Sequence, residues 1–169
     1  FPEYLDYLNN YYAENKPKWD FLVLSDNSRN SFRMTARENG LHTLRTTYVP
    51  LFKRSGAIPV FLDTHAYFDY TGETHDIPTF TSVSYEGYQQ YAATLESFLP
   101  PWQKPRIAPS GIVFLAVWEE DHALWETLFH SDRAHASPLG TFLQACVIHY
   151  PLLGHLPLRK EVLRNDMSS

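Results

Sequence analysis

The sequence has little of what marks several large classes of protein. It contains one cysteine, Cys146, which excludes an internal disulfide framework and a cysteine-rich zinc site. Its longest apolar run, Ile112 to Trp118, spans seven residues, whereas a membrane-crossing helix needs about 18. The net charge is -5, so a basic surface that follows nucleic-acid phosphates is not expected. We therefore expect no membrane span and no nucleic-acid partner.

What is present is the composition of an ordinary folded domain. Hydrophobic residues make up 44% of the 169 residues and charged residues 20%, close to the averages for globular proteins. This length fits one domain and leaves little for a second. Aromatic residues reach 15%, which suits a core and also interfaces. The chain begins at Phe1 with no initiator methionine or targeting segment, and we expect it to be part of a longer polypeptide, separated by processing or truncation.

Short apolar runs alternate with amphipathic segments along the chain. The runs predict three strands, at 19–24, 58–62 and 106–108. The amphipathic segments predict five helices, at 2–14, 41–53 (kinked or ended by Pro50), 85–98 (capped by Ser84), 112–120 and 138–150 (capped by Ser137), with a surface loop at 69–82. This alternation indicates an α/β fold, a three-layer sandwich around a parallel sheet whose strands follow chain order.

A parallel sheet of three strands is thin, and its first strand raises a specific problem. The segment from Phe21 to Leu24 is apolar at every position, which predicts that helices cover both faces of this strand. Its in-plane edge would present unpaired backbone groups. We therefore expect a strand from outside residues 1–169 to pair with this edge.

The sharpest chemical signal is Asp132-Arg-Ala-His135, just before the last predicted helix. A carboxylate three residues from an imidazole can orient the ring and fix its tautomer, so that His135 can take a proton from a hydroxyl nucleophile and return it to a leaving group. We predict that both residues lie on one loop at the carboxyl edge of the sheet, with the carboxylate facing Nδ1. The alternative is a surface loop with a helix cap nearby.

The segment from Asp132 to Cys146 resembles the C-terminal block of SGNH (GDSL-type) hydrolases, and is most similar to a branch with the pattern D-G-x-H-P-S-P-x-G-x-Y-L-A-A-C. Three further segments agree in order: Trp19 to Leu24 resembles the branch's W-D-Y-V-V-L strand, Gly56 to Val60 its G-A-x-P-V strand, and Ile107 to Gly111 its A-P-V-G turn. The sequence departs from the branch at Arg133, where glycine is usual, at Ala136, where proline is usual, and at His65, where tryptophan is usual.

The resemblance implies a flavodoxin-like three-layer fold and hydrolysis of esters by a Ser-His-Asp arrangement, with His135 as base and Asp132 as its orienter. It also implies a missing part, because the family's nucleophile lies in a G-[DN]-S turn well upstream. Ser25 and Ser28 follow the wrong strand and lack a preceding glycine. The resemblance therefore identifies residues 1–169 as a single partial domain, the C-terminal two-thirds, which an upstream segment or a second polypeptide completes.

Other polar residues near the predicted carboxyl edge are candidates for binding substrate. The segment from Ser25 to Arg29 falls where the family places an asparagine that donates to the oxyanion, and Asn27 is the first candidate, with Ser25 or Asp26 as alternatives. We predict that Asn27 lies within about 8 Å of His135. An Asx-type turn explains the same residues without any catalytic role.

Asp63 and His65 are second-tier candidates, because they follow a strand at the edge where open α/β sheets bind ligands. A lone histidine such as His65 is more often structural than functional. The segment from Glu119 to His122 favours a solvated helix face over a metal site, since adjacent residues on a helix point in different directions. We expect no metal and no cofactor.

Two functions remain open. The first is a serine ester hydrolase acting on an O-acyl ester, on a carbohydrate or a small lipid, whose serine comes from outside this chain. The second is a non-catalytic subunit or binding module that uses a tyrosine-rich surface to bind a protein or glycan. The resemblance slightly favours an extracellular or secretory location.

Overall fold

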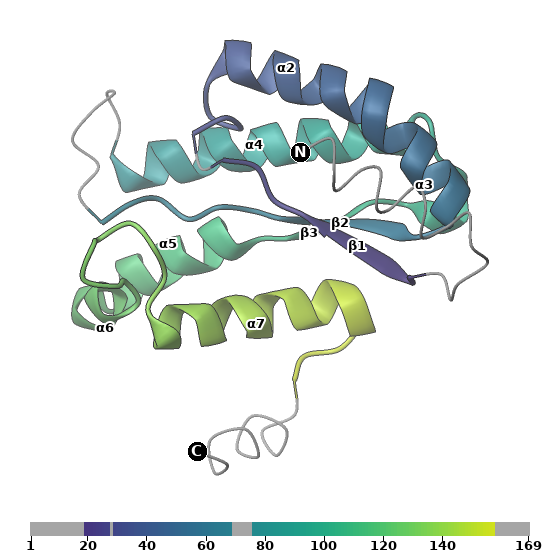
Figure 1. Ribbon diagram of the computed structural model, residues 1–169. Helices are drawn as coiled ribbons and strands as arrows, with labels where there is room; N and C mark the ends of the chain where they lie inside the picture. Colours follow the sequence, from purple (N-terminus) through teal and green to yellow (C-terminus); the bar gives the residue numbers. More distant parts are fainter. Residues whose placement is uncertain (1–18, 28, 69–75, 158–169) are drawn as a thin grey trace.

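The structure is a computed structural model that describes residues 19–27, 29–68 and 76–157. Its centre is a parallel sheet of three strands, β1 (Phe21–Leu24), β2 (Ile58–Leu62) and β3 (Arg106–Ala108), in that order (Figure 1). Val23 pairs with Val60, and Val60 pairs with Arg106. The predicted strands, their parallel direction and their order in the sheet are therefore confirmed. The predicted helix at 2–14 lies outside the described residues.

Helices form a layer on each side of the sheet, as predicted. The helices in chain order are α2 (Met34–Thr43), the π-helical turn η1 (Leu44–Tyr48), α3 (Val49–Ser55), α4 (Ile77–Glu96), the 3-10 turn η2 (Pro101–Gln103), α5 (Ser110–Glu120), α6 (His122–Thr127) and α7 (Pro138–Leu153). In Figure 1, α2, α3 and α4 lie on one side of the sheet and α7 on the other. Within the described residues no helix is long and apolar enough to span a bilayer.

The main core fills the space between the sheet and the layer of α2, α3 and α4. Phe52, Tyr88 and Leu95 are completely buried there. Pro59 is tolerated in the middle strand because the pairing of β2 with β3 begins only at Val60, so the absent N–H of Pro59 removes no bond from that ladder. These contacts hold the carboxyl ends of β1 and β2 side by side.

The helices that the structure describes cover β1 on one face only, which corrects the expectation that helices bury both its faces. Leu22 packs into the main core with 8% of its surface exposed, but Val23 on the opposite face is 47% exposed. The reason is the position of α7, which packs against β3 and β2 on that face of the sheet. Among the described residues, β2 is the only strand paired with β1, so the outer edge of β1 has no strand partner there.

Two predicted helix boundaries are wrong. The helix before β2 begins at Met34 and runs past Pro50 to Ser55, because Pro50 lies in the first turn of α3, directly after the π turn, where the helical ladder changes its spacing. The helix α4 begins at Ile77, inside the segment predicted to be a loop.

The N-cap of α4 is Asp76, whose carboxylate accepts a hydrogen bond from the Thr79 amide at 2.8 Å. Ser84 is buried within α4, and its Oγ lies 2.6 Å from the Ser31 Oγ. The Asp-Ile-Pro start of α4 is a helix signal that the loop-like composition of 69–82 hides.

Candidate active site

The segment from Leu128 to Ser137 is a compact loop between α6 and α7. Its backbone closes on itself, because the His130 amide donates to the His135 carbonyl at 2.8 Å and the Ser137 amide donates to the Leu128 carbonyl at 2.8 Å. Ser137 also caps α7, as predicted, by accepting a hydrogen bond from the Gly140 amide at 3.1 Å. The two ends of the loop are therefore fixed by hydrogen bonds between residues that lie close together in the sequence.

Arg133 takes the left-handed conformation in this loop, with φ at 57°. That conformation favours glycine, which is the residue usual at this position in the branch that the sequence resembles. A non-glycine residue there costs about 1–2 kcal/mol. The guanidinium of Arg133 lies 4.6 Å from the centre of the Phe68 ring, and this cation–π contact offsets part of that cost.

Asp132 and His135 are in direct contact, as predicted. The His135 Nδ1 lies 2.7 Å from the Asp132 Oδ2, and the Oδ1 accepts bonds from the amides of Ala134 and His135, each at 2.9 Å. The His135 and Ala134 amides, followed by the imidazole, hold the pKa of Asp132 well below its usual range. The carboxylate is therefore ionised at neutral pH and can accept a hydrogen bond from the protonated Nδ1.

This contact selects the tautomer of His135 in which Nδ1 carries the proton and Nε2 is a free acceptor. The His135 side chain is 85% exposed, and its Nε2 makes no hydrogen bond with any residue that the structure describes. An oriented imidazole with an open Nε2 is the arrangement a general base requires.

The loop lies at the carboxyl edge of the sheet, again as predicted. The residues that follow β2 hold it there, because the Phe68 amide donates to the Arg133 carbonyl at 3.1 Å and the His65 Nε2 lies 3.2 Å from the Ala134 carbonyl oxygen. The chain segment after β2 thus determines where the pair of Asp132 and His135 sits.

His65 lies beneath this loop and both of its ring nitrogens contact the protein. Burial lowers its pKa, so the ring is neutral, and Nε2 donates to Ala134 while Nδ1 accepts from the Gln144 side chain at 3.3 Å. The ring also stacks on Phe114, with 4.5 Å between the ring centres. Its predicted part in substrate binding stays a prediction, and these contacts make it a support for the loop.

Asn27 forms the Asx turn that was the alternative to its catalytic role. Its side-chain oxygen accepts a hydrogen bond from the Arg29 amide at 3.3 Å. The Nδ2 group of the same side chain makes no hydrogen bond with the described residues, so it remains available as a donor. Ser25 donates to the Leu62 carbonyl at 3.2 Å, which ties this turn to the end of β2. The distance from Asn27 to His135 stays a prediction.

Asp63 is buried at the end of β2, with 1% of its surface exposed. Burial raises its pKa to about 7, against the smaller lowering effect of the Gly111, Thr64 and Ile112 amides. Within the described part of the chain, neither carboxylate oxygen has a hydrogen-bond partner of ordinary geometry. The predicted binding role of Asp63 stays a prediction, and its side chain lies below the surface.

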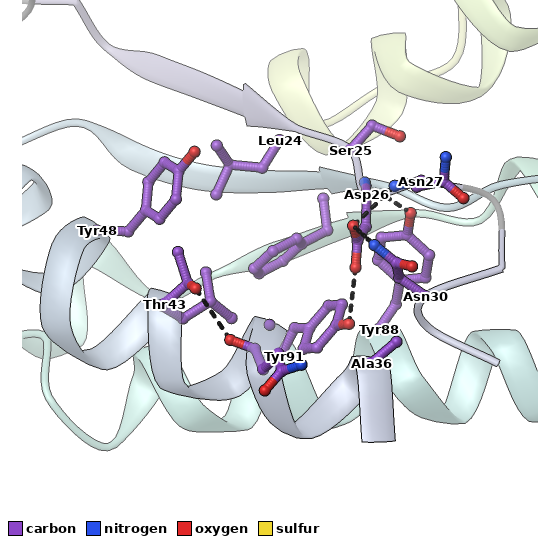
Figure 2. A pocket seen from close by; sticks show the side chains of 14 residues that line it. Leu24, Ser25, Asp26, Asn27, Asn30, Ala36, Thr43, Tyr48, Tyr88 and Tyr91 are labelled. Carbon is purple, nitrogen blue, oxygen red and sulfur yellow. Dashed lines mark hydrogen bonds between the residues drawn. The ribbon is translucent and has the colours of Figure 1, made fainter. Parts of the chain in front are cut away.

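A cavity of about 630 Å³ opens beside the turn that follows β1, and the sequence did not indicate it (Figure 2). The Asp26 carboxylate lines it and accepts hydrogen bonds from the Tyr91 hydroxyl at 2.8 Å and the Asn30 side chain at 2.9 Å. The Asp26 amide donates to the Tyr88 hydroxyl at 3.1 Å. Both tyrosines are buried on α4, but no local pattern shows that their hydroxyls meet Asp26.

The sheet order, the helical layers and the histidine loop at the carboxyl edge define an α/β protein with a partial SGNH-hydrolase fold. No protein-family model and no curated protein matches the sequence. Among solved structures, the chain is similar to a putative SGNH hydrolase from Slackia heliotrinireducens, with 21% sequence identity and a TM-score of 0.64. The match covers 87% of this chain and 72% of that chain. It supports the fold that the sequence motifs predicted.

Proposed function

We propose that this chain is the part of an SGNH-type ester hydrolase that supplies the catalytic base. The observation that carries the proposal is the contact of 2.7 Å between the His135 Nδ1 and the Asp132 Oδ2, together with the open Nε2 of an exposed imidazole. In this mechanism Nε2 takes the proton of a serine hydroxyl as its oxygen attacks the ester carbonyl. The same nitrogen then returns the proton to the leaving alcohol, while Asp132 stabilises the imidazolium.

The serine comes from outside residues 1–169, on a strand that pairs with the free edge of β1. Two features support this step: the chain has no G-[DN]-S turn, and no described strand pairs with the outer edge of β1. The exposed face of β1 at Val23 would be covered by the same added segment. Asn27, whose Nδ2 is available, donates to the oxyanion that forms on the ester carbonyl.

The substrate that we propose for this hydrolase is an O-acyl ester carried by a carbohydrate or a small lipid.

A second candidate function is a non-catalytic binding module. The observation that favours it is the row of exposed apolar residues on α7, among them Phe142 at 43%, Tyr150 at 57% and Leu153 at 59% exposed, which suits contact with another protein.

A serine-directed fluorophosphonate and an ester substrate distinguish the two functions, applied to the protein purified from its natural source. We expect one labelled serine in a peptide that is not part of residues 1–169, and hydrolysis of p-nitrophenyl acetate. Intact mass and N-terminal sequencing of the same sample identify the segment that carries the serine. If no serine is labelled and no ester is hydrolysed, the binding module is the better function.

Replacing His135 tests the proposed base directly in the active protein. His135→Ala is expected to lower kcat by about 10³-fold or more with little change in KM, because the general base is lost while the binding surface remains. His42→Ala, an exposed histidine on α2, is the matched control and should keep the full kcat. Full activity of His135→Ala would exclude His135 as the base.

A further inference from the structure

The cavity beside β1 has a polar end and an apolar end. In Figure 2, Ser25, Asp26 and Asn27 lie at one end and Tyr48 at the other, with Tyr91 between the two. The polar end belongs to the turn at the carboxyl end of β1, which carries the amide of Asn27. A group attached to a carbonyl at Asn27 therefore has the cavity directly beside it.

Several polar atoms of the cavity wall are already hydrogen-bonded within the protein. Burial and the Asp26 carboxylate raise the pKa of Tyr91, so its hydroxyl stays protonated and donates to that carboxylate at 2.8 Å. The Thr43 hydroxyl donates to the Asn39 carbonyl at 2.9 Å. A ligand with few polar groups can cover these bonded atoms without leaving a donor or acceptor unpaired, whereas the hydroxyls of a sugar would have to compete with the existing bonds.

Most of the remaining wall is hydrocarbon and aromatic, although Asn39 also lines it. Leu24, Leu44 and Phe61 line it, together with the ring of Tyr48. Leu44 and Tyr48 belong to the π turn η1, and π turns inside helices occur frequently at functional sites. A volume of about 630 Å³ is within the range of small-molecule pockets and corresponds to roughly 20 water molecules at about 30 Å³ each.

We propose that this cavity holds the acyl group of the ester substrate, and that this group is uncharged and mainly apolar, such as a medium-length alkyl chain or an aryl group. This assignment rests on the proposed ester hydrolysis and specifies its substrate. The carboxylate of Asp26 at the polar end disfavours acyl groups that carry a second carboxylate, because two negative charges would face each other in a partly buried space.

Binding of uncharged amides tests the pocket without requiring hydrolysis. Butyramide, hexanamide and octanamide are titrated into the full protein and followed by ligand-observed NMR, with methyl glucoside and succinamate as comparison compounds. Each added methylene should tighten binding about three- to four-fold until the cavity is full, since burying one CH₂ group gives a factor of this size. Methyl glucoside and succinamate should bind more weakly than hexanamide.

A substitution that fills the cavity provides the matched control. Thr43 lines the cavity from the exposed end of α2, so Thr43→Phe should weaken hexanamide binding at least ten-fold without disturbing the core. Thr35→Phe, on the same helix at an exposed position outside the lining, should leave binding unchanged. Circular dichroism of both variants shows that the fold is kept, and Ala36→Phe is a second filling variant if Thr43→Phe does not fold.

Any one of three results would overturn the acyl pocket. They are amide affinity that does not depend on chain length, hexanamide binding by Thr43→Phe that equals that of the unmodified protein, and tighter binding of methyl glucoside than of hexanamide. This failure is distinguishable from failure of the proposed function. Amide binding that depends on chain length, with no ester hydrolysis, would support the acyl pocket and refute the proposed hydrolase. Ester hydrolysis that depends on His135, with no such amide binding, would support the hydrolase and refute the acyl pocket.

Discussion

Asp63 is expected to make the stability of the protein fall as pH rises, which is unusual for an aspartate. Its pKa is about 7 in the folded chain because it is buried, and returns to the ordinary value of 3.8 when the chain unfolds. The folded state therefore holds this proton more tightly than the unfolded state. The stability that comes with the neutral carboxyl is fully present below about pH 4 and is lost as pH rises through 7.

The size of the effect follows from the two pKa values. One pH unit corresponds to 1.36 kcal/mol of differential interaction, so the difference between about 7 and 3.8 is worth about 4 kcal/mol. With 1% of its surface exposed, Asp63 gains little screening from solvent. This amount is a large share of the roughly 5–15 kcal/mol that stabilises a folded domain.

Asp63→Asn is the perturbation that isolates this group, because the amide has nearly the shape of the protonated carboxyl and does not ionise. Urea unfolding of both proteins from pH 4 to pH 8.5 measures the difference in free energy of unfolding. We expect the two to be similar at pH 4 and the variant to gain about 1.4 kcal/mol per pH unit up to pH 7, where the gain levels off near 4 kcal/mol. The titration of the histidines is common to both proteins and cancels in the difference.

Asp20→Asn is the matched control, since Asp20 is an exposed aspartate directly before β1. Its difference from the unmodified protein should remain within about 0.5 kcal/mol across the same pH range. The reasoning is refuted if Asp63→Asn shows no pH-dependent gain, or if it is the less stable protein at pH 8. Either result would mean that Asp63 is ionised in the folded chain and has a stabilising partner.

The remaining predictions concern local geometry and catalysis. Gly111→Ala should destabilise the fold by about 2–3 kcal/mol in urea unfolding, because a Cβ there would lie 2.5 Å from the Thr64 carbonyl oxygen; an unchanged midpoint would show that α5 can move away. Asp76→Ala should cost about 1 kcal/mol by removing the cap of α4, and Asp76→Asn should restore most of it, as only an acceptor oxygen is needed. In the active protein, Asp132→Asn should lower kcat by up to about 10⁴-fold, because an amide can hold the wrong tautomer of His135; retained kcat would remove Asp132 from the mechanism.

Features of short sequence range could be predicted before the structure was known. The contact between Asp132 and His135 spans three residues, and the Ser137 cap also bonds three residues ahead, so residue type and spacing were enough to predict both. The three strands and their parallel order also followed from apolar runs alternating with helices, because right-handed crossovers leave few other topologies. The start of α4 was missed although its signal is local, since Asp76 and Pro78 lie in a segment whose composition resembles a loop.

Features that depend on distant residues were decided by tertiary structure alone. Asp26 and Tyr91 are 65 residues apart, and His65 and Ala134 are 69 apart, so no local pattern could pair them. The cavity exists only because the turn after β1, the π turn and α4 meet around it. Asp63 was identified from its place at the end of a strand, but the burial that raises its pKa comes from the close approach of α5 at Gly111. Sequence determines which groups are available and how near neighbours bond, whereas burial, and with it charge state, depends on which segments the folded chain packs around each group.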